Sequence, residues 1–307
     1  MKQLKNLNLI FLIIFLSSCQ PAFLLKKQSK SLSEFSYNSW ILPEKIDEIS
    51  GLEYVDDGFY GFNDSGGEPE IYKFITSDTA EIIQTIRLSN AKNIDWEEMA
   101  MSEEYIFVGD FGNNRGNRDD LKVYYFQKNK LNQNPDQEVM VDSMGFFYPE
   151  QDTFDVQAHN HDFDMEAMVY FHDKLHLFTK SWNSMRTKHY TLDIVHGKQP
   201  AWLVEEYDLN FIITGADLFK LNEKYSRLGL VGYTKHGEVY MLLTDIQPDN
   251  TFWFNQPKTI IYLGLAGDVG QVEGISILSK NEVCFSAEAI TMEGKSKEQN
   301  LTCISLK

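Results

Sequence analysis

Five short segments of the chain bring polar, mostly acidic residues to a recurring spacing ahead of an aliphatic residue. They are residues 48–52, 95–99, 164–168, 214–218 and 271–275. In three of them a glutamate stands at the third position, and these glutamates are Glu97, Glu166 and Glu273. A hydrophobic run follows each segment, and such recurrence is typical of a repeat architecture. If the repeats surround one axis, their carboxylates will meet there.

Carboxylates that meet at an axis suit the binding of a cation. Two of them about 4 Å apart repel by roughly 1 to 4 kcal/mol, depending on the local dielectric, so either their pKa values rise or a cation lies between them. Ligands that are all oxygen favour Ca²⁺ over zinc. The residues expected to face or border the axis are Glu97, Glu166, Glu273, Asp95, Asp164 and Glu48, with Asp217 from the fourth repeat. The alternative is that these carboxylates cap backbone amides of the neighbouring repeat.

A second group of polar residues follows the second hydrophobic run of each repeat, where it would lie at the same end of the axis. It combines acids and amides with one cationic group in three of the repeats: Asn63, Asp64, Arg115, Lys180, Lys235 and Glu288. Cationic donors beside a metal can hold an anionic ligand, because they share its phosphate or carboxylate oxygens. The alternative is that these segments are tight turns, since glycine, asparagine and aspartate accept a positive φ.

The hydrophobic runs predict short strands, because they are rich in aromatic and β-branched residues and are separated by Asp, Asn and Gly. In the first repeat they cover residues 49–55, 59–63, 71–76 and 81–88. Four strands in a repeat predict an all-β chain with a single β-propeller over residues 37–307. We count five blades. Six blades are the alternative if residues 145–161 hide a degenerate unit, and a β-sandwich is the second alternative.

The fifth repeat is one strand short. Residues 35–42 precede the first repeat and read as a strand without a partner. We expect them to complete the last blade, which closes the ring and removes exposed sheet edges. Cys284 and Cys303 both fall in this repeat. An oxidising compartment would allow a disulfide between them, and two buried thiols fit the sequence equally well.

The N-terminus has the features of an export signal. Lys2 and Lys5 precede an apolar run over residues 7–16, which is too short to span a bilayer as a helix. The tetrapeptide Leu16-Ser17-Ser18-Cys19 follows and resembles the bacterial lipobox, in which the cysteine is acylated and becomes the new N-terminus. We therefore expect Cys19 to be lipidated and the protein to be exported to the cell envelope, where the outer membrane is its expected location.

These features divide the chain and limit its partners. Residues 1–18 are expected to be a lipoprotein signal peptide, and residues 19–36 a lipidated cysteine with a flexible tether to the membrane. The formal net charge is −17, and it becomes −19 once Lys2 and Lys5 leave with the signal. A charge this negative repels phosphate backbones, so nucleic acid is not an expected partner. A cation, a small anion held beside it, or another component of the envelope fits better.

Four short motifs resemble those of a bacterial propeller group that includes the SdiA-regulated proteins and the esterase-like phytase domains. They are Val272-Glu273-Gly274-Ile275, Met165-Glu166-Ala167-Met168, Asn63-Asp64-Ser65-Gly66-Gly67 and Gly109-Asp110-Phe111-Gly112-Asn113. The resemblance covers residues 40–307. Phytase-type propellers are calcium-dependent phosphoesterases, and the resemblance implies metal ligands at Glu97, Glu166, Glu273 and Asp110 and phosphate contacts at Lys180, Lys235 and Arg115. The chain departs from the pattern at Ser50 and Ala216, which stand where a glutamate is expected.

Together these observations predict a lipid-anchored propeller that binds a ligand or partner at the mouth of its channel, with Ca²⁺ as the expected cation. The first alternative is a metal-dependent ester or phosphoester hydrolase that uses a metal-bound water. The second alternative is a structural protein of the cell surface.

Overall fold

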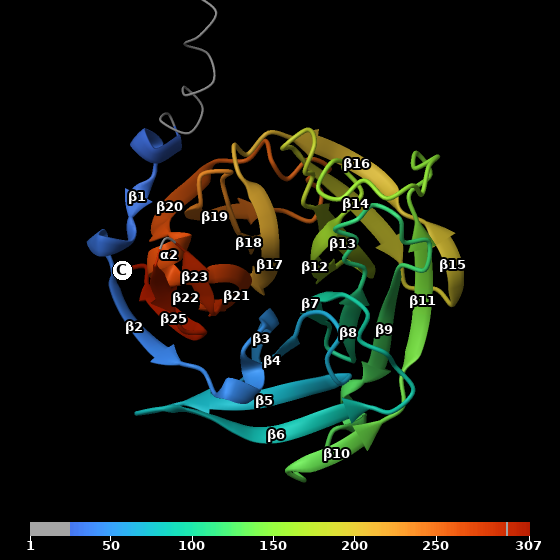
Figure 1. The fold of residues 1–307 in the computed structure, drawn as a ribbon, viewed down its shortest axis with the longest axis horizontal. Coiled ribbons are helices and arrows are strands. Elements are labelled where there is room, and N and C mark those ends of the chain that lie inside the picture. The colour runs from blue at the N-terminus through green and yellow to red at the C-terminus, as the bar shows by residue number, and fades with distance from the viewer. Residues whose placement is uncertain (1–24, 293) are drawn as a thin grey trace, which may run out of the picture.

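Five separate sheets surround a central axis. The computed structural model describes residues 25–292 and 294–307, and in each sheet the strand at one end lies nearest the axis (Figure 1). These innermost strands are β3 (Ile49–Val55), β7 (Trp96–Met101), β12 (Met165–Phe171), β17 (Ile212–Lys220) and β21 (Gln271–Ser279). The prediction of a single five-bladed β-propeller is confirmed. The six-bladed alternative is wrong because residues 148–164 form no strand, and the ring of sheets excludes a sandwich.

Each blade continues outward through three further antiparallel strands. Blade 1 has β4 (Gly58–Asn63), β5 (Glu70–Thr76) and β6 (Ala80–Leu88). Blade 2 has β8 (Tyr105–Asp110), β9 (Lys122–Gln127) and β11 (Asp142–Phe147). Blade 3 has β13 (Lys174–Thr179), β14 (Thr187–Asp193) and β16 (Trp202–Tyr207). Blade 4 has β18 (Ser226–Tyr233), β19 (Glu238–Ile246) and β20 (Lys258–Leu265). Blade 5 has β22 (Glu282–Glu288), β25 (Asn300–Ser305) and β2 (Ser36–Ile41).

Apolar side chains fill the five seams between neighbouring blades. Successive residues of a strand face opposite sides of its sheet, so each blade contributes to the seams on both of its sides. Between blades 1 and 2, for example, the rings of Phe62 and Trp96 meet edge to face with their centroids 5.3 Å apart. Because the apolar residues lie between the blades, polar side chains of the innermost strands are left to line the channel.

The ring is closed by the N-terminal strand. β2 pairs with β25 in antiparallel register, with Trp40 opposite Leu301, as predicted for residues 35–42. The indole N–H of Trp40 also donates to the Ser77 carbonyl of blade 1 at 2.8 Å, so this strand contacts the blades on both sides of the closure. A disulfide joins Cys284 on β22 to Cys303 on β25, which decides between the two states that the sequence left open.

Three short outer strands are not predicted by the hydrophobic pattern. β10 (Asp136–Val139) pairs in parallel with β6 of blade 1, β15 (Gly197–Pro200) with β11 of blade 2, and β1 (Lys30–Ser31) with β20 of blade 4. Each precedes the outermost strand of the next blade, so the chain pairs with one blade edge and then crosses to the following one. We call β1, β10 and β15 the bridging strands.

At the seam between blades 3 and 4 a loop takes the place of a bridging strand. Trp253 stacks on His176 with ring centroids 4.2 Å apart, and its backbone N–H donates to Glu205 Oε1 at 2.7 Å. His189 lies between these residues, 2.8 Å from His176 and 3.2 Å from Glu205. Burial lowers the pKa of both histidines, that of His176 to about 3, so the pair is neutral at pH 7.

The segment before β2 is packed against blade 4. Leu25 is buried in the core between blades 3 and 4, and β1 adds to β20. Ser31 and Glu34 form a capping box around the short helix η1 (Leu32–Glu34). Residues 25–36, the described part of the expected flexible tether, are therefore folded onto the propeller. The expected signal peptide and Cys19 lie outside the described residues, and within 25–292 and 294–307 no helix is long and apolar enough to cross a membrane.

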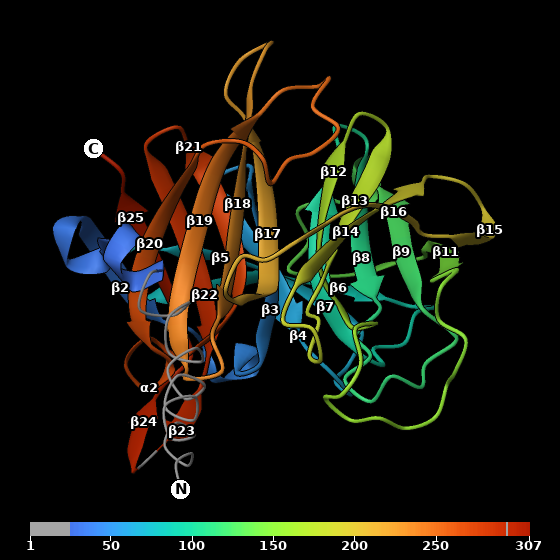
Figure 2. The same cartoon turned by 90° about the horizontal axis from the view of Figure 1, so that it is seen from above.

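The remaining elements are small. They are η2 (Glu44–Ile46), η3 (Lys128–Lys130), the helix α2 (Ala266–Val269) and a hairpin of β23 (Ile290–Met292) and β24 (Lys295–Lys297). Figure 2 shows α2 and the hairpin together at one face of the ring. α2 directly precedes β21, so this is the face at which the innermost strands begin. We call this end of the axis the channel mouth.

Candidate functional site

Each innermost strand has an irregular register near its start. The extra residue of this β-bulge is Glu97 in β7, Glu166 in β12, Thr214 in β17 and Glu273 in β21, and in β3 the irregularity falls between Ser50 and Glu53. A bulge takes a residue out of the strand ladder and re-aims its side chain. The repeated motif therefore encodes a bulge that presents one side chain per blade at the channel mouth.

The bulge in β17 shows which residue of the fourth repeat stands at the position of the glutamates, and it differs from the expected one. Thr214 occupies the position of the glutamates, and Ala216, which was expected there, lies two residues further along β17. The Thr214 hydroxyl donates to the Val272 carbonyl at 2.6 Å, and the Ser50 hydroxyl donates to the Glu97 carbonyl at 2.6 Å. The two blades without a glutamate thus use a hydroxyl to bind the backbone of the next blade.

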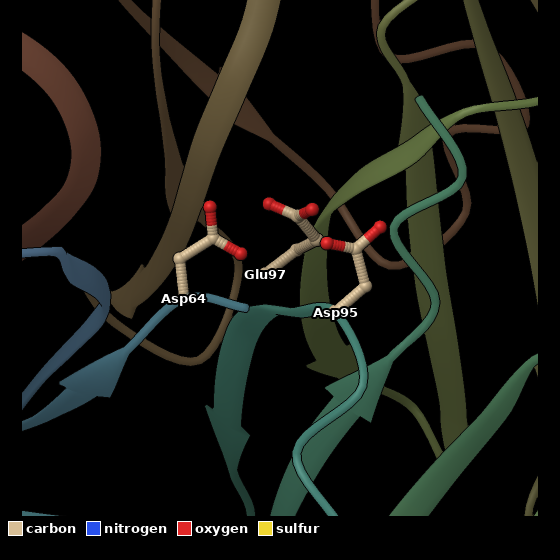
Figure 3. Close-up of side chains that lie close together, drawn as sticks. All are labelled: Asp64, Asp95 and Glu97. Carbon is tan, nitrogen blue, oxygen red and sulfur yellow. The ribbon is translucent and has the colours of Figure 1, made fainter. Parts of the chain in front are cut away.

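Three carboxylates form a cluster at the mouth. Asp64 follows β4, Asp95 precedes β7 and Glu97 is the bulged residue of β7. Each offers an oxygen that lies within 4.8 Å of the other two, and Figure 3 shows the three carboxylate groups facing a common space. Glu97 is 5% exposed. The predicted carboxylate ring is thus brought together most tightly where blades 1 and 2 meet.

Besides Asp110, four carboxylates have a buried oxygen that receives no hydrogen bond from the residues in 25–292 and 294–307. These oxygens are Asp64 Oδ1, Glu97 Oε1, Glu166 Oε1 and Glu273 Oε2. They come from blades 1, 2, 3 and 5. Buried polar atoms are almost always paired in folded proteins, so each such oxygen requires an explanation. A cation that accepts several oxygen ligands supplies one.

The pKa values of these groups are raised by burial first and by each other second. Burial and the charge of Asp95 raise the pKa of Asp64 to about 8. Burial and the charge of Asp164 raise the pKa of Asp95 to about 6, and burial with the charge of Glu273 raises that of Glu288 to about 9. The pKa values of the three bulged glutamates are raised in the same way. At pH 7 the folded protein therefore keeps protons on some of these carboxyls unless a cation replaces them.

The ammonium group of Lys180 balances part of the negative charge of the carboxylates at the channel mouth. Its Nζ lies 3.0 Å from Glu166 Oε2 and above the rings of Trp182 and Tyr233, at 5.0 and 5.6 Å from their centroids. Its charge lowers the pKa of six carboxyls, namely Asp64, Asp95, Glu97, Glu166, Glu273 and Glu288. We call these six residues the acidic group. Burial alone would lower the pKa of Lys180, but Glu166 and its neighbours raise it. One ammonium faces six acids, so the group attracts further positive charge.

Two predicted metal ligands are engaged in the protein instead. Asp164 accepts from the backbone N–H of Asn113 at 2.6 Å and from the indole N–H of Trp182 at 2.7 Å. Asp110 accepts from Arg118 at 3.0 Å and from the backbone N–H of Asp95 at 3.2 Å. Both oxygens of Asp164 are occupied, and Asp110 is in an ion pair. Asp164 therefore positions the cluster and offers it no free oxygen, whereas Asp110 Oδ2 is buried without a hydrogen bond, 3.7 Å from Lys122 Nζ.

The capping interpretation holds for the carboxylates deeper in the channel. Glu98 Oε2 accepts from the backbone N–H of Ala216 at 2.8 Å, which joins blade 2 to blade 4 across the axis. Asp217 accepts from the backbone N–H of Ile277 of blade 5 at 2.5 Å. Among the residues expected at the axis, Asp217 therefore follows the capping alternative, since its oxygens hold backbone amides.

The other predicted ligand-binding residues are dispersed around the mouth. Glu288 is half-buried, and its pKa responds to Glu273 and Asp64. Asn63 donates to the Lys45 carbonyl at 2.9 Å, and its own side-chain oxygen is buried and unpaired among the described residues. The remaining three, Glu48, Arg115 and Lys235, are exposed. Of the three predicted cationic groups, only Lys180 lies inside the acidic group.

Sequence reasoning missed three residues that shape the site. Arg118 donates to Asp110 and to the Gly112 carbonyl, the latter at 2.9 Å. The sequence pattern points to Arg115 and not to Arg118. Trp182 and Tyr233 flank Lys180. Trp182 and Tyr233 lie at or close to the ends of the second strands β13 and β18, where the predicted ligand-binding residues also lie, and this position was an available signal. Arg118 lies eight residues after the end of β8 and had no such signal.

Substitution of Gly112 by alanine is expected to abolish cation binding with little change in the fold. A Cβ at this position would lie 2.0 Å from Glu97 Oε1 and 2.6 Å from Asp95 Oδ2, so both carboxylates must move. We expect the Ca²⁺ affinity, measured by calorimetric titration, to fall at least tenfold. Gly267→Ala is the matched control, since a Cβ there meets nothing within 4 Å. Equal affinities of the two variants would show that this geometry does not matter for binding.

The fold and the site together define a five-bladed β-propeller with an acidic channel mouth. No family model matches the chain, and no curated protein matches it. Among solved structures it is similar to a protein of unknown function from Dyadobacter fermentans, with 8% identity and a TM-score of 0.46 over 88% of this chain and 99% of that one.

Two of the other similar structures are enzymes by their descriptions. One is an α-L-arabinofuranosidase from Podospora anserina, with 9% identity and a TM-score of 0.45 over 88% of this chain and 96% of that one. The other is a bifunctional GH43-CE protein from Bacteroides eggerthii, with 12% identity and a TM-score of 0.42 over 85% of this chain and 36% of that one. Similarities this low carry no activity over to this chain.

Proposed function

We propose that this protein binds Ca²⁺ at the Asp64, Asp95 and Glu97 cluster and, beside the cation, a small anionic ligand at the channel mouth. The observation that carries the proposal is the buried, unpaired Oε1 of Glu97 within 4.8 Å of oxygens from the other two residues. An acidic cluster on a surface needs no ion, but Glu97 is nearly buried, and burial and the charges of three neighbouring acids raise its pKa. Such a carboxylate gains free energy when a cation replaces its proton.

The donor set favours Ca²⁺ among the common metals. All three residues offer carboxylate oxygens, and hard oxygen ligands exclude the sites typical of zinc and copper. The residues come from a turn, a strand end and a bulge in two blades, so small adjustments of the ligand distances are possible. Ca²⁺ accepts six to eight oxygens in flexible geometry, whereas Mg²⁺ requires a near-ideal octahedron. Solvent and a bound anion can supply the ligands that the three residues do not.

The positive charges beside the cluster are the reason to propose an anionic ligand. The acidic group repels an anion, so an anion binds only where positive charge offsets the carboxylates. A cation at the cluster and the ammonium of Lys180 would supply that charge from two sides. A phosphate or a carboxylate is the class of group that two such partners share.

The test is a calorimetric titration of chelator-treated protein with Ca²⁺. Wild type is expected to bind one ion, and Glu97→Gln is expected to lose the binding because the neutral amide cannot replace the carboxylate. The control is Glu138→Gln, which removes one negative charge from an exposed position on β10. No heat of binding with wild type would remove the cation from the proposal. Release of 4-nitrophenol from 4-nitrophenyl phosphate in the presence of Ca²⁺, absent in Glu97→Gln, would identify the protein as a phosphoesterase.

We also propose that the protein is an exported lipoprotein held on a membrane through Cys19. The support is the sequence Leu16-Ser17-Ser18-Cys19 after an apolar run, because attached acyl chains stabilise membrane binding by about 0.8 kcal/mol per buried methylene. Cys19→Ser is expected to shift the protein from the membrane fraction to the soluble fraction of a bacterial host, as measured by fractionation. Ser33→Thr, outside this tetrapeptide, is a control that keeps the cysteine. Membrane retention of Cys19→Ser would contradict the lipid anchor.

A further inference from the structure

A pocket of about 520 Å³ opens beside the acidic group, between blades 3, 4 and 5. Its volume falls in the range of about 300 to 1,000 Å³ that is typical of small-molecule sites. Most of its wall is apolar or aromatic, and the residues that define it are Trp182, Ile212, Tyr233, Val239, Ala266 and Ile290. Ile290 belongs to the β23–β24 hairpin and Ala266 to α2, the two elements that lie together at the channel mouth (Figure 2). Both elements therefore contribute to the pocket lining.

The pocket and the acidic group share a wall. Trp182 lines the pocket and donates its indole N–H to Asp164 at 2.7 Å. Gln271 also lines it and donates to Glu273 Oε1 at 2.8 Å. The ring of Tyr233 completes this wall, with Lys180 Nζ 5.6 Å from its centroid on the side of the acids. A ligand of moderate size can therefore contact both compartments at once.

The two compartments differ in chemistry. The pocket offers aromatic rings, since His159, Trp182 and Tyr233 all line it. Flat rings favour a planar partner through stacked or edge-to-face contacts. The neighbouring compartment offers Lys180 and the proposed cation, which select an anionic group, and Lys235 adds an exposed ammonium to the pocket lining.

We infer that the pocket binds the aromatic ring of a small ligand whose anionic group is held at the channel mouth. The inference rests on the proposed function for the anionic group, whereas the ring is recognised by the pocket itself. The ligand class is an aryl phosphate or aryl carboxylate. An anion without a ring fills only half of this combined site.

The experiment compares 4-nitrophenyl phosphate with inorganic phosphate in the presence of Ca²⁺. Wild type is expected to bind the aryl phosphate about tenfold more tightly, because burial of the ring adds apolar contact area. Ala266→Phe fills the pocket from a half-buried position, away from the carboxylates, and is expected to remove that difference while the affinities for Ca²⁺ and inorganic phosphate stay unchanged. Leu265→Phe is the control, since Leu265 is 45% exposed and its neighbour Ala266 is the residue that lines the pocket.

A second probe separates a failure of the pocket from a failure of the cation site. With Ca²⁺ chelated, 4-nitrophenol is expected to bind wild type and not Ala266→Phe, as followed by tryptophan fluorescence. Binding of this phosphate-free ring by a protein that gives no heat of Ca²⁺ binding would uphold the pocket and overturn the proposed function. Equal affinities for phosphate and aryl phosphate in wild type, with Ca²⁺ bound, would overturn the pocket alone.

Discussion

Chelated protein is expected to lose stability as the pH rises from 7 to 9, and Ca²⁺ is expected to restore it. The folded-state pKa is about 8 for Asp64 and about 9 for Glu288, whereas carboxyls in an unfolded chain titrate near 4. Between these values the folded protein binds more protons than the unfolded protein. The stabilisation by the protonated carboxyls is complete below pH 4 and is lost as the pH passes the folded-state values. Between the unfolded-state and folded-state pKa values, each such group lowers the free energy of unfolding by about 1.4 kcal/mol per pH unit.

The measurement is urea unfolding at pH 7, 8 and 9, with chelator and with Ca²⁺. The window starts at pH 7 because His176, whose pKa burial lowers to about 3, destabilises the fold only as the pH falls below about 6.5. A ligand at a hundred times its dissociation constant stabilises the folded state by about 2.7 kcal/mol, which is the expected size of the Ca²⁺ effect. Asp64→Asn with Glu288→Gln should give a flatter profile. A wild-type profile that is flat without Ca²⁺ would refute the raised pKa values.

Lys180→Met is expected to destabilise the protein by about 3 to 5 kcal/mol. Removal of one partner from a buried ion pair leaves the other charge uncompensated, and Glu166 is 1% exposed. The loss also raises the pKa values of the carboxyls that Lys180 now lowers. Urea unfolding of wild type and variant at pH 7 gives the difference in the free energy of unfolding.

The matched control for Lys180→Met is the double variant with Glu166→Gln. Without the carboxylate there is no charge to leave unpaired, so the double variant is expected to recover most of the lost stability. Ca²⁺ should stabilise Lys180→Met, because the cation can replace part of the missing charge. A loss for the single variant under 1 kcal/mol, or a double variant no more stable than the single one, would show that Lys180 does not balance these acids.

The sequence predicts the architecture well because the repeated unit is local. The strands alternate, the turns carry glycine and aspartate, and residues 35–42 supply the missing strand, which the structure places at Ser36–Ile41. The bridging strands escape prediction because they are two to four residues long and pair in parallel with a different blade. Such pairing depends on what lies beside the segment after folding, and no local pattern encodes it.

The candidate site is predicted by residue type and only partly by role. Glu97, Glu166 and Glu273 recur at one spacing, and the structure places all three at bulges of the channel mouth. Asp110 and Asp164 have the same chemistry, yet Arg118 and a backbone amide hold one oxygen of Asp110, and Trp182 and a backbone amide hold both oxygens of Asp164. Those partners come from other segments, so spacing alone cannot separate a free carboxylate from a paired one. The resemblance to phytase-type propellers stays a prediction, and only its fold is confirmed.

The route of the N-terminal segment has a mechanical consequence. The chain meets blade 4 first, through Leu25 and then β1, and only then enters blade 5 as β2, which closes the ring. If the protein hangs from a membrane by its N-terminus, a pulling force reaches the two-residue pairing of β1 with β20 before it reaches the six-residue closing strand. The short pair can peel away and absorb the load, so that tension on the anchor does not open the propeller.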